Sequence, residues 1–275
     1  MQVGVVEELC RFPVKSMQGE RQGTLELVAG PGAERGFVGD RRHAVVTNDA
    51  NRTLSAKTVP ELLFASARID GGRTVVMLPS GTELDADDPA TSAAVAAWLD
   101  RDVRLARADT ALVTAYDMTF DPPNDDAEQF AIPTPEGTFF DLMGVHALTT
   151  GSLATMGAAR PETAWEPARF RPNILIATEG APTDPADPAA YPEDAWVGGA
   201  LRFGRDDDHA PSIQVALRSV RCAMPVRAQP GIERDVEVFR TMNAHHDNHL
   251  GIYCEPVVGG DVNVGDPVFF APAAG

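Results

Sequence analysis

The stretch VGVVEEL, residues 3–9, is the first of five short runs rich in strand-forming residues within the first hundred positions. The others are TLELV (24–28), HAVVT (43–47), FASARID (64–70) and RTVVML (73–78). Turn-forming residues lie between them, in GPGAERG (30–36), TNDANRT (47–53), DGG (70–72) and PSG (79–81). Short β-branched runs bounded by Gly, Pro, Asn and Asp are typical of strands joined by tight turns. This part of the chain is therefore expected to form a small β-barrel or sandwich.

A single helix interrupts this pattern at about residues 88–100. Asp88 is a suitable N-cap, Pro89 suits the first helical position, and Val95, Trp98 and Leu99 form an apolar stripe at helical spacing. We expect this helix to cover the barrel.

The chain changes character between Met118 and Gly137, where MTFDPPNDDAEQFAIPTPEG is rich in proline and acidic residues and lacks periodicity. Such composition predicts a linker or long loop, so we divide the chain into domains 1–117 and 118–275. In the second domain we expect a strand and helix over 145–159, buried strands at 172–178 and 213–220, an amphipathic helix over 233–245 and a strand pair at 261–270. The proline-rich segment 179–195 is expected to be a surface loop.

Composition limits the possible functions. The chain has 275 residues, 44% of them hydrophobic, with no apolar run long enough to span a bilayer and no secretory leader. We therefore expect a cytoplasmic protein without a membrane partner. The net charge of -17 disfavours nucleic acid, and three cysteines in no CxxC spacing disfavour a disulfide framework. The two lysines, Lys15 and Lys57, lie in no setting that suggests a pyridoxal phosphate Schiff base.

In so acidic a chain, the positions where lysine and arginine residues cluster indicate where a small anion would bind. PVKS (13–16) puts a lysine and a hydroxyl after a strand, and GDRR (39–42) precedes a strand and LSAK (54–57). RFRPNILI (169–176) offers Arg169, Arg171 and Asn173, which suit bidentate recognition of an anion. RSVRCAMPVRAQPG (218–231) surrounds Cys222 with arginines, which favour a thiolate able to bind a soft metal; a buried, inert cysteine is the alternative.

The order of these motifs, followed by EDAW (193–196), RC (221–222), LGIY (250–253) and VNVGDPV (262–268), closely resembles the MOSC family with its N-terminal β-barrel domain. The chain is similar to the hydroxylamine-reducing branch that includes the mitochondrial amidoxime reducing component. The resemblance implies a mainly β, α+β protein with an N-terminal β-barrel-like domain and a C-terminal MOSC β-barrel domain carrying peripheral helices.

The resemblance also implies a molybdenum cofactor, a molybdopterin, held between the two domains. Cys222 would be the molybdenum ligand and the catalytic residue. The cofactor-binding residues implied by the family's motifs are Lys15, Ser16, Arg41, Thr149, Ser152, Arg171, Asn173, Arg221 and Cys222.

The function implied is reduction of N-hydroxylated or N-oxide small molecules. The chain has no cysteine cluster for an iron–sulfur centre, so a separate electron donor is expected, such as a ferredoxin, a cytochrome b5-like protein or a flavin reductase. Two alternatives stay open: a sulfur carrier or cofactor-delivery protein with a persulfide on Cys222, and a binding module that has lost its cofactor.

A last alternative comes from NAHHDNHLG (243–251). His245 and His249 are four residues apart and would share one face of a helix, so a zinc site with His246 and Asp247 can be imagined, although HExxH is absent. A solvated loop is the competing interpretation.

Overall fold

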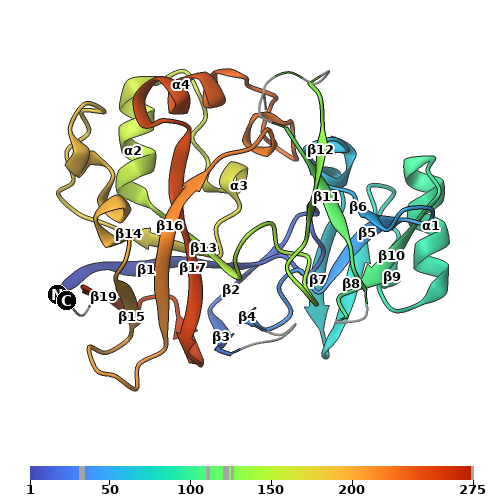
Figure 1. Cartoon of the computed structure of the whole chain (residues 1–275), viewed down its shortest axis with the longest axis horizontal. Helices are drawn as coiled ribbons and strands as arrows, with labels where there is room; N and C mark the ends of the chain where they lie inside the picture. Colours follow the sequence, from blue (N-terminus) through green and yellow to red (C-terminus); the bar gives the residue numbers. More distant parts are fainter. Residues whose placement is uncertain (31–34, 110–111, 120–123, 125–126, 274–275) are drawn as a thin grey trace.

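The computed structural model describes residues 1–30, 35–109, 112–119, 124 and 127–273. Parts of the predicted turn 30–36 and of the predicted linker 118–137 lie outside the described residues. The fold has two lobes, and both chain termini lie at the far end of one of them (Figure 1). It is a mixed α+β fold dominated by strands, as predicted.

One lobe is a closed seven-stranded barrel. Its sheet has the order β14-β13-β17-β16-β15-β19-β1-β2, and an additional pairing of β1 with β14 closes it. The seven strands of the ring are β1 (Gln2–Arg11), β13 (Val145–Thr149), β14 (Ile174–Ala177), β15 (Ala200–Phe203), β16 (Ser212–Val220), β17 (His249–Val258) and β19 (Pro267–Ala271); β2 (Glu20–Gln22) pairs with β1 outside the ring. Closure leaves no strand edge unpaired within the ring.

The first strand of the chain therefore belongs to this barrel. Val5 pairs with Ala177 in β14 and with Pro267 in β19, so the run predicted at 3–9 does form a strand, but with partners from the far end of the sequence. Val6 and Leu9 are buried in the barrel core, in the same apolar cluster as Ile213. This pairing makes the N-terminal strand part of a barrel whose other strands come from residues 145–271.

The second lobe is built from short strands, antiparallel except for the parallel pair β6–β11. It has a five-stranded sheet of order β10-β5-β6-β11-β12 and a smaller sheet of order β7-β8-β9; a third small sheet, β18-β3-β4, packs against the barrel core through Leu25, Leu27, Phe37 and Val262. The bounds are β3 (Thr24–Val28), β4 (Gly36–Phe37), β5 (His43–Thr47), β6 (Arg52–Thr53), β7 (Ser66–Asp70), β8 (Arg73–Met77), β9 (Glu83–Asp85), β10 (Val103–Arg107), β11 (Ala115–Met118), β12 (Phe130–Pro133) and β18 (Gly260–Asn263).

The helix predicted near residue 88 is confirmed as α1 (Pro89–Leu99). The Asp88 carboxylate accepts from the backbone N–H of Ala90, and the helix ends at Asp100 in the left-handed conformation. Val95 is buried against this lobe's core, and α1 packs beside β10.

The remaining helices lie over the barrel (Figure 1). They are α2 (Thr150–Ala159), α3 (Pro167–Phe170) and α4 (Glu237–His246), with 3-10 helices η2 (Pro188–Ala190), η3 (Pro192–Trp196) and η4 (Met224–Val226); η1 (Pro60–Phe64) belongs to the other lobe. No helix in the described part of the chain is long and apolar enough to cross a membrane.

The prediction of a surface loop over 179–195 is partly wrong. Two 3-10 helices form there, each with proline in its first turn, and Tyr191 and Glu193 are buried. Proline fixes a backbone angle compatible with the first turn of a helix, so the prolines that argued against regular structure start these short helices instead.

Candidate functional site

Cys222 follows β16 directly and lies in the wall of two cavities. A cavity of about 360 Å³, the larger cavity, is lined by Lys57, Thr58, Asp117, Met118, Cys222 and Arg227, among others. A smaller one of about 80 Å³, the basic cavity, has cations along its wall: Lys15, Arg41, Lys57, Arg171 and Arg221. Lys57, Met118 and Cys222 line both cavities, so the two meet at the thiol.

The basic cavity brings together six of the predicted residues from distant parts of the chain: Lys15, Ser16, Arg41, Arg171, Arg221 and Cys222. Three of them have left-handed backbone conformations, with φ of 69° at Ser16, 49° at Arg41 and 54° at Arg171. Non-glycine residues rarely adopt this conformation, and those that do are often found at binding sites.

Arg171 is a buried cation in the wall of the basic cavity. Its side chain is 5% exposed, both terminal nitrogens lack a hydrogen-bond partner among the described residues, and the guanidinium lies 4.1 Å from the centre of the Phe12 ring. Burial and the neighbouring Arg41 lower the pKa of Arg171 to about 9. A buried cation without an anionic partner is costly, so an anion would be accommodated readily here.

Unlike Arg171, Arg221 has hydrogen-bond partners for both terminal nitrogens of its guanidinium. It donates to the Ser219 hydroxyl at 2.9 Å and to the Phe170 carbonyl at 2.9 Å, and its NH1 lies 3.1 Å from Nε2 of His146. Burial and the charges of Arg221 and Arg41 keep the pKa of His146 well below its usual value. His146 is therefore neutral and accepts a hydrogen bond from Arg221, which fixes that guanidinium in the wall.

Asn173 lies behind the wall, not in it. It is fully buried; its amide oxygen accepts from the backbone N–H of His146 at 3.1 Å and lies 3.4 Å from Arg41, and its amide nitrogen donates to the Cys10 carbonyl. Asp40 forms an ion pair with Arg41 on the same side. Asn173 thus ties β1, β13 and Arg41 together.

Thr149 and Ser152 are placed away from the basic cavity. Both hydroxyls donate to Oε2 of Glu193, at 2.5 and 2.6 Å, and Thr149 also caps α2 by accepting from the Ser152 N–H. Their hydrogen bonds join α2 to η3, so in this structure both hydroxyls serve the packing of the helices over the barrel.

Two residues at the site were not among those predicted: Lys57 and Asp141. Asp141 lies 2.6 Å from the Lys15 nitrogen and 3.3 Å from the Lys57 nitrogen, so both lysines of the chain converge on one carboxylate. The ring of Tyr116 lies beneath both ammonium groups, at 5.3 and 4.5 Å. The scarcity of lysine was a usable signal for Lys57, whereas FFDLMG (139–144) contains no motif that marks Asp141.

The histidine cluster does not form the imagined site. α4 ends at His246, and Asp247 and Asn248 are left-handed, so the prediction that His245 and His249 share a helix face is wrong. Both ring nitrogens of His246 have partners, Asp194 at 2.8 Å and the His249 carbonyl at 2.9 Å. Over the described residues, no group of three or more His, Cys, Asp or Glu side chains is arranged to hold a metal ion.

Comparison with known protein families agrees with this architecture. Residues 3–126 match the MOSC N-terminal beta barrel domain, and residues 138–269 match the MOSC domain. The chain belongs to the MOSC domain family. MOSC domains are associated with molybdenum cofactor binding or sulfur transfer. Residues 127–137, which include β12, separate the two matched ranges, and Gln129 of this segment lines the larger cavity.

Two solved structures are similar in outline to this MOSC protein. The YuaD protein from Bacillus subtilis is 10% identical, with a TM-score of 0.47 over 97% of this chain and 94% of that one. YiiM from Geobacillus stearothermophilus is 10% identical, with a TM-score of 0.34 over 56% of this chain and 72% of that one. No curated protein sequence matches the chain.

The wall residues fit the anionic cofactor associated with MOSC domains. Five cations line the basic cavity, whereas the lining includes one carboxylate, Asp141. The two unpartnered nitrogens of Arg171 are donors in the fork geometry that matches a phosphate. The Cys222 sulfur supplies a soft ligand suited to molybdenum at the junction of the cavities.

Proposed function

We propose that this MOSC protein is a molybdenum cofactor-dependent oxidoreductase that reduces small N-hydroxylated or N-oxide compounds with electrons from a separate protein. The observation that carries the proposal is the pairing of Arg171, whose buried donors lack partners, with Cys222 in the wall of one cavity. The Arg171 guanidinium orients an anion, and the Cys222 thiol binds a metal.

The chain's own residues have separate tasks in this proposal. Arg171, Arg221 and Lys15 hold the anionic part of the cofactor, and Arg41 is oriented for the same purpose by Asn173 and Asp40. Cys222 holds the molybdenum. When bound, the cofactor supplies two-electron reduction with removal of oxygen from nitrogen. For a hydroxylamine the balance is RNHOH + 2 e⁻ + 2 H⁺ → RNH2 + H2O, with the electrons from the partner protein.

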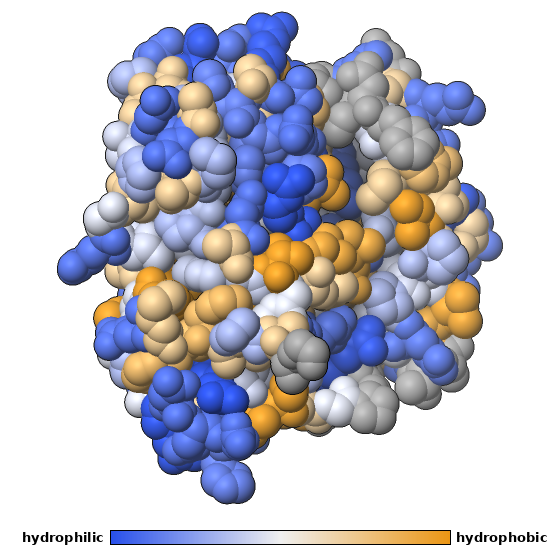
Figure 2. Space-filling view, turned by 60° about the vertical axis from the view of Figure 1, so that its left-hand side comes forward, coloured by the Kyte–Doolittle hydropathy of each residue, from blue (hydrophilic) through white to orange (hydrophobic). Residues whose placement is uncertain are grey.

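The substrate is placed in the larger cavity, because that cavity meets the basic cavity at Cys222. Its lining combines hydrogen-bonding side chains such as Thr58 and Gln129 with the apolar Met118 and Pro60. A mixed wall of this kind orients a small molecule through a few polar contacts. Figure 2 shows a hollow in the surface where hydrophilic side chains border an apolar strip.

The test is the molybdenum content per chain, measured by elemental analysis of protein purified from a host that makes the cofactor. Cys222→Ala should lose the metal, or lose the spectral signature of its thiolate. Cys10→Ala is the matched control, because Cys10 is another free, partly buried cysteine that does not line either cavity. Wild-type protein that carries neither molybdenum nor pterin would overturn the proposal.

The same preparations test the persulfide alternative. If Cys222 carries sulfur instead, protein without molybdenum should release sulfide on treatment with a thiol reductant, and Cys222→Ala should not. Turnover of an N-hydroxylated compound by the molybdenum-loaded protein with a chemical reductant would decide for the reductase.

A further inference from the structure

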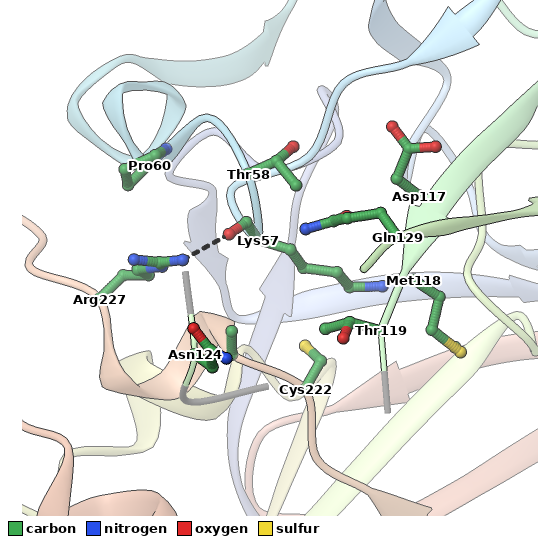
Figure 3. A pocket seen from close by; sticks show the side chains of 11 residues that line it. Lys57, Thr58, Pro60, Asp117, Met118, Thr119, Asn124, Gln129, Cys222 and Arg227 are labelled. Atoms are coloured by element: carbon green, nitrogen blue, oxygen red, sulfur yellow. Dashed lines mark hydrogen bonds between the residues drawn. The ribbon is translucent and has the colours of Figure 1, made fainter. Parts of the chain in front are cut away.

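Lys57 is one of two cations in the described wall of the larger cavity. It lies in the wall of both cavities and is 8% exposed. Figure 3 shows its side chain extending across the larger cavity, with the Cys222 sulfur pointing in from the opposite side. A group held at the Lys57 nitrogen would therefore lie in the space next to Cys222.

Among the described residues, the Lys57 ammonium has fewer hydrogen-bond partners than N–H donors. Lys15 uses two donors, to the Phe139 carbonyl and to Oδ1 of Asp141, each at 2.6 Å. The contact of Lys57 with Asp141 is longer, 3.3 Å, and engages the other carboxylate oxygen. An ammonium has three N–H donors and no acceptor, so Lys57 can take a further acceptor without losing Asp141.

Lys15 and Lys57 together carry one more charge than the single carboxylate, Asp141, that both contact. Asp141 is shared between two lysines, and burial, which alone would lower the pKa of Lys57, is outweighed by Asp141, Cys222, Tyr116 and Tyr253, so the pKa is raised and the ammonium stays charged. Asp141 lines the basic cavity, whereas the carboxylate in the described wall of the larger cavity is Asp117, which pairs with Arg52 at 3.2 Å.

A second cation stands on the same wall. Arg227 donates to the Lys57 carbonyl at 2.7 Å, which fixes the guanidinium beside the base of the lysine (Figure 3). In a chain with a net charge of -17, the described lining of the larger cavity holds two cations, Lys57 and Arg227, and one carboxylate, Asp117. A wall with more cations than carboxylates favours anionic ligands by charge complementarity.

We propose that the larger cavity binds small carboxylate-bearing molecules, with Lys57 as the residue that receives the carboxylate. The inference rests on the proposed function for its consequence: the preferred substrates are N-hydroxylated compounds that also carry a carboxylate. Thr58 and Gln129 provide hydrogen bonds to the rest of the ligand, and Met118 packs against its apolar part.

The direct test is calorimetric titration of the protein, purified from a cofactor-producing host, with benzoate and with benzamide. These probes have the same size and differ in charge. Benzoate should bind at least about tenfold more tightly to the wild type, Lys57→Met should abolish the difference, and Lys57→Arg should restore it. Arg68→Met, which removes an exposed cation of the same lobe, should leave it unchanged.

Benzamide binding as tightly as benzoate, or a benzoate preference that survives in Lys57→Met, would overturn the inference. A preference lost in Arg171→Met but kept in Lys57→Met would also overturn it, because the anion would then lie in the basic cavity.

Turnover separates this inference from the proposed function. With benzamidoxime and its 4-carboxylate derivative, Lys57→Met should raise the ratio of KM for the carboxylate to KM for the neutral compound about tenfold. Turnover of both compounds without a charge preference keeps the reductase and refutes the role of Lys57. A benzoate preference without turnover of either compound supports the anion site and refutes the reductase.

Discussion

The carboxylate of Asp141 lies 2.6 Å from the ammonium of Lys15, which stands 126 positions earlier in the chain. Lys15 and Lys57 lower the pKa of Asp141 well below its usual 3.8, against the raising effect of burial. The contact joins the turn after β1 to the segment that enters β13, so it holds the two lobes together at the wall of the basic cavity.

Asp141→Asn should lower the free energy of unfolding by about 2 kcal/mol, because both lysines would lose their counter-charge. The wild-type carboxylate has a lowered folded-state pKa, so its contribution is complete above pH 3.8 and is lost as the pH falls below that value. Urea unfolding at several pH values measures the difference. Asp117→Asn, at a half-buried carboxylate that pairs with one cation, Arg52, is the control, and equal effects of the two substitutions would contradict the prediction.

Glu193→Gln should make the protein more stable than the wild type as the pH rises above 4.5. Burial raises the pKa of Glu193 above 4.5, so the folded chain keeps a proton that the unfolded chain releases, and stability falls as the pH rises from 4.5 through the folded-state pKa. A glutamine oxygen can still accept from Thr149 and Ser152.

Relative to the wild type, Glu193→Gln should gain about 1 kcal/mol between pH 5 and pH 8, as measured by urea unfolding. The exposed Glu162 provides the matched control, Glu162→Gln. Parallel stability curves for wild type and Glu193→Gln would show that Glu193 does not titrate in this range.

Arg171→Met should stabilise the protein in the absence of an anion, by about 1 kcal/mol, because it removes a buried guanidinium whose terminal nitrogens lack partners. The methionine keeps an apolar contact with the Phe12 ring. Inorganic phosphate should raise the Tm of the wild type, and the variant should lose this increase. Thermal unfolding of cofactor-free protein with and without phosphate measures both effects; an undiminished phosphate effect would refute the role assigned to Arg171.

Arg169→Met should have the opposite pattern. Arg169 is 2% exposed and donates to the carbonyls of Ala164, Pro225 and Glu233 at 2.7, 3.1 and 3.0 Å. Its loss leaves three carbonyls unpaired and should lower the free energy of unfolding by about 3 kcal/mol. The phosphate effect on Tm should persist, and its loss would mean that the two arginines act together.

These two arginines show how far sequence reasoning reaches. RFRPN predicts an anion-binding segment before a buried strand, and β14 does follow it. The motif alone does not distinguish Arg169 from Arg171, because the distinction depends on which guanidinium finds carbonyl partners in other parts of the chain. Arg171, which has a left-handed backbone, lines the basic cavity, while Arg169 donates to carbonyls in other parts of the chain.

The sequence alone determined the short strands, the capped helix α1 and the motif order that identifies a MOSC protein. These features depend on turn residues, caps and alternation within a few positions, so they can be read from neighbouring residues. The tertiary structure decided that β1 completes a barrel with β14 and β19, that Thr149 and Ser152 bind Glu193, and that Lys57 shares Asp141 with Lys15. Those contacts join residues far apart in the chain, and they follow from barrel closure and the exclusion of unpaired charge from the interior.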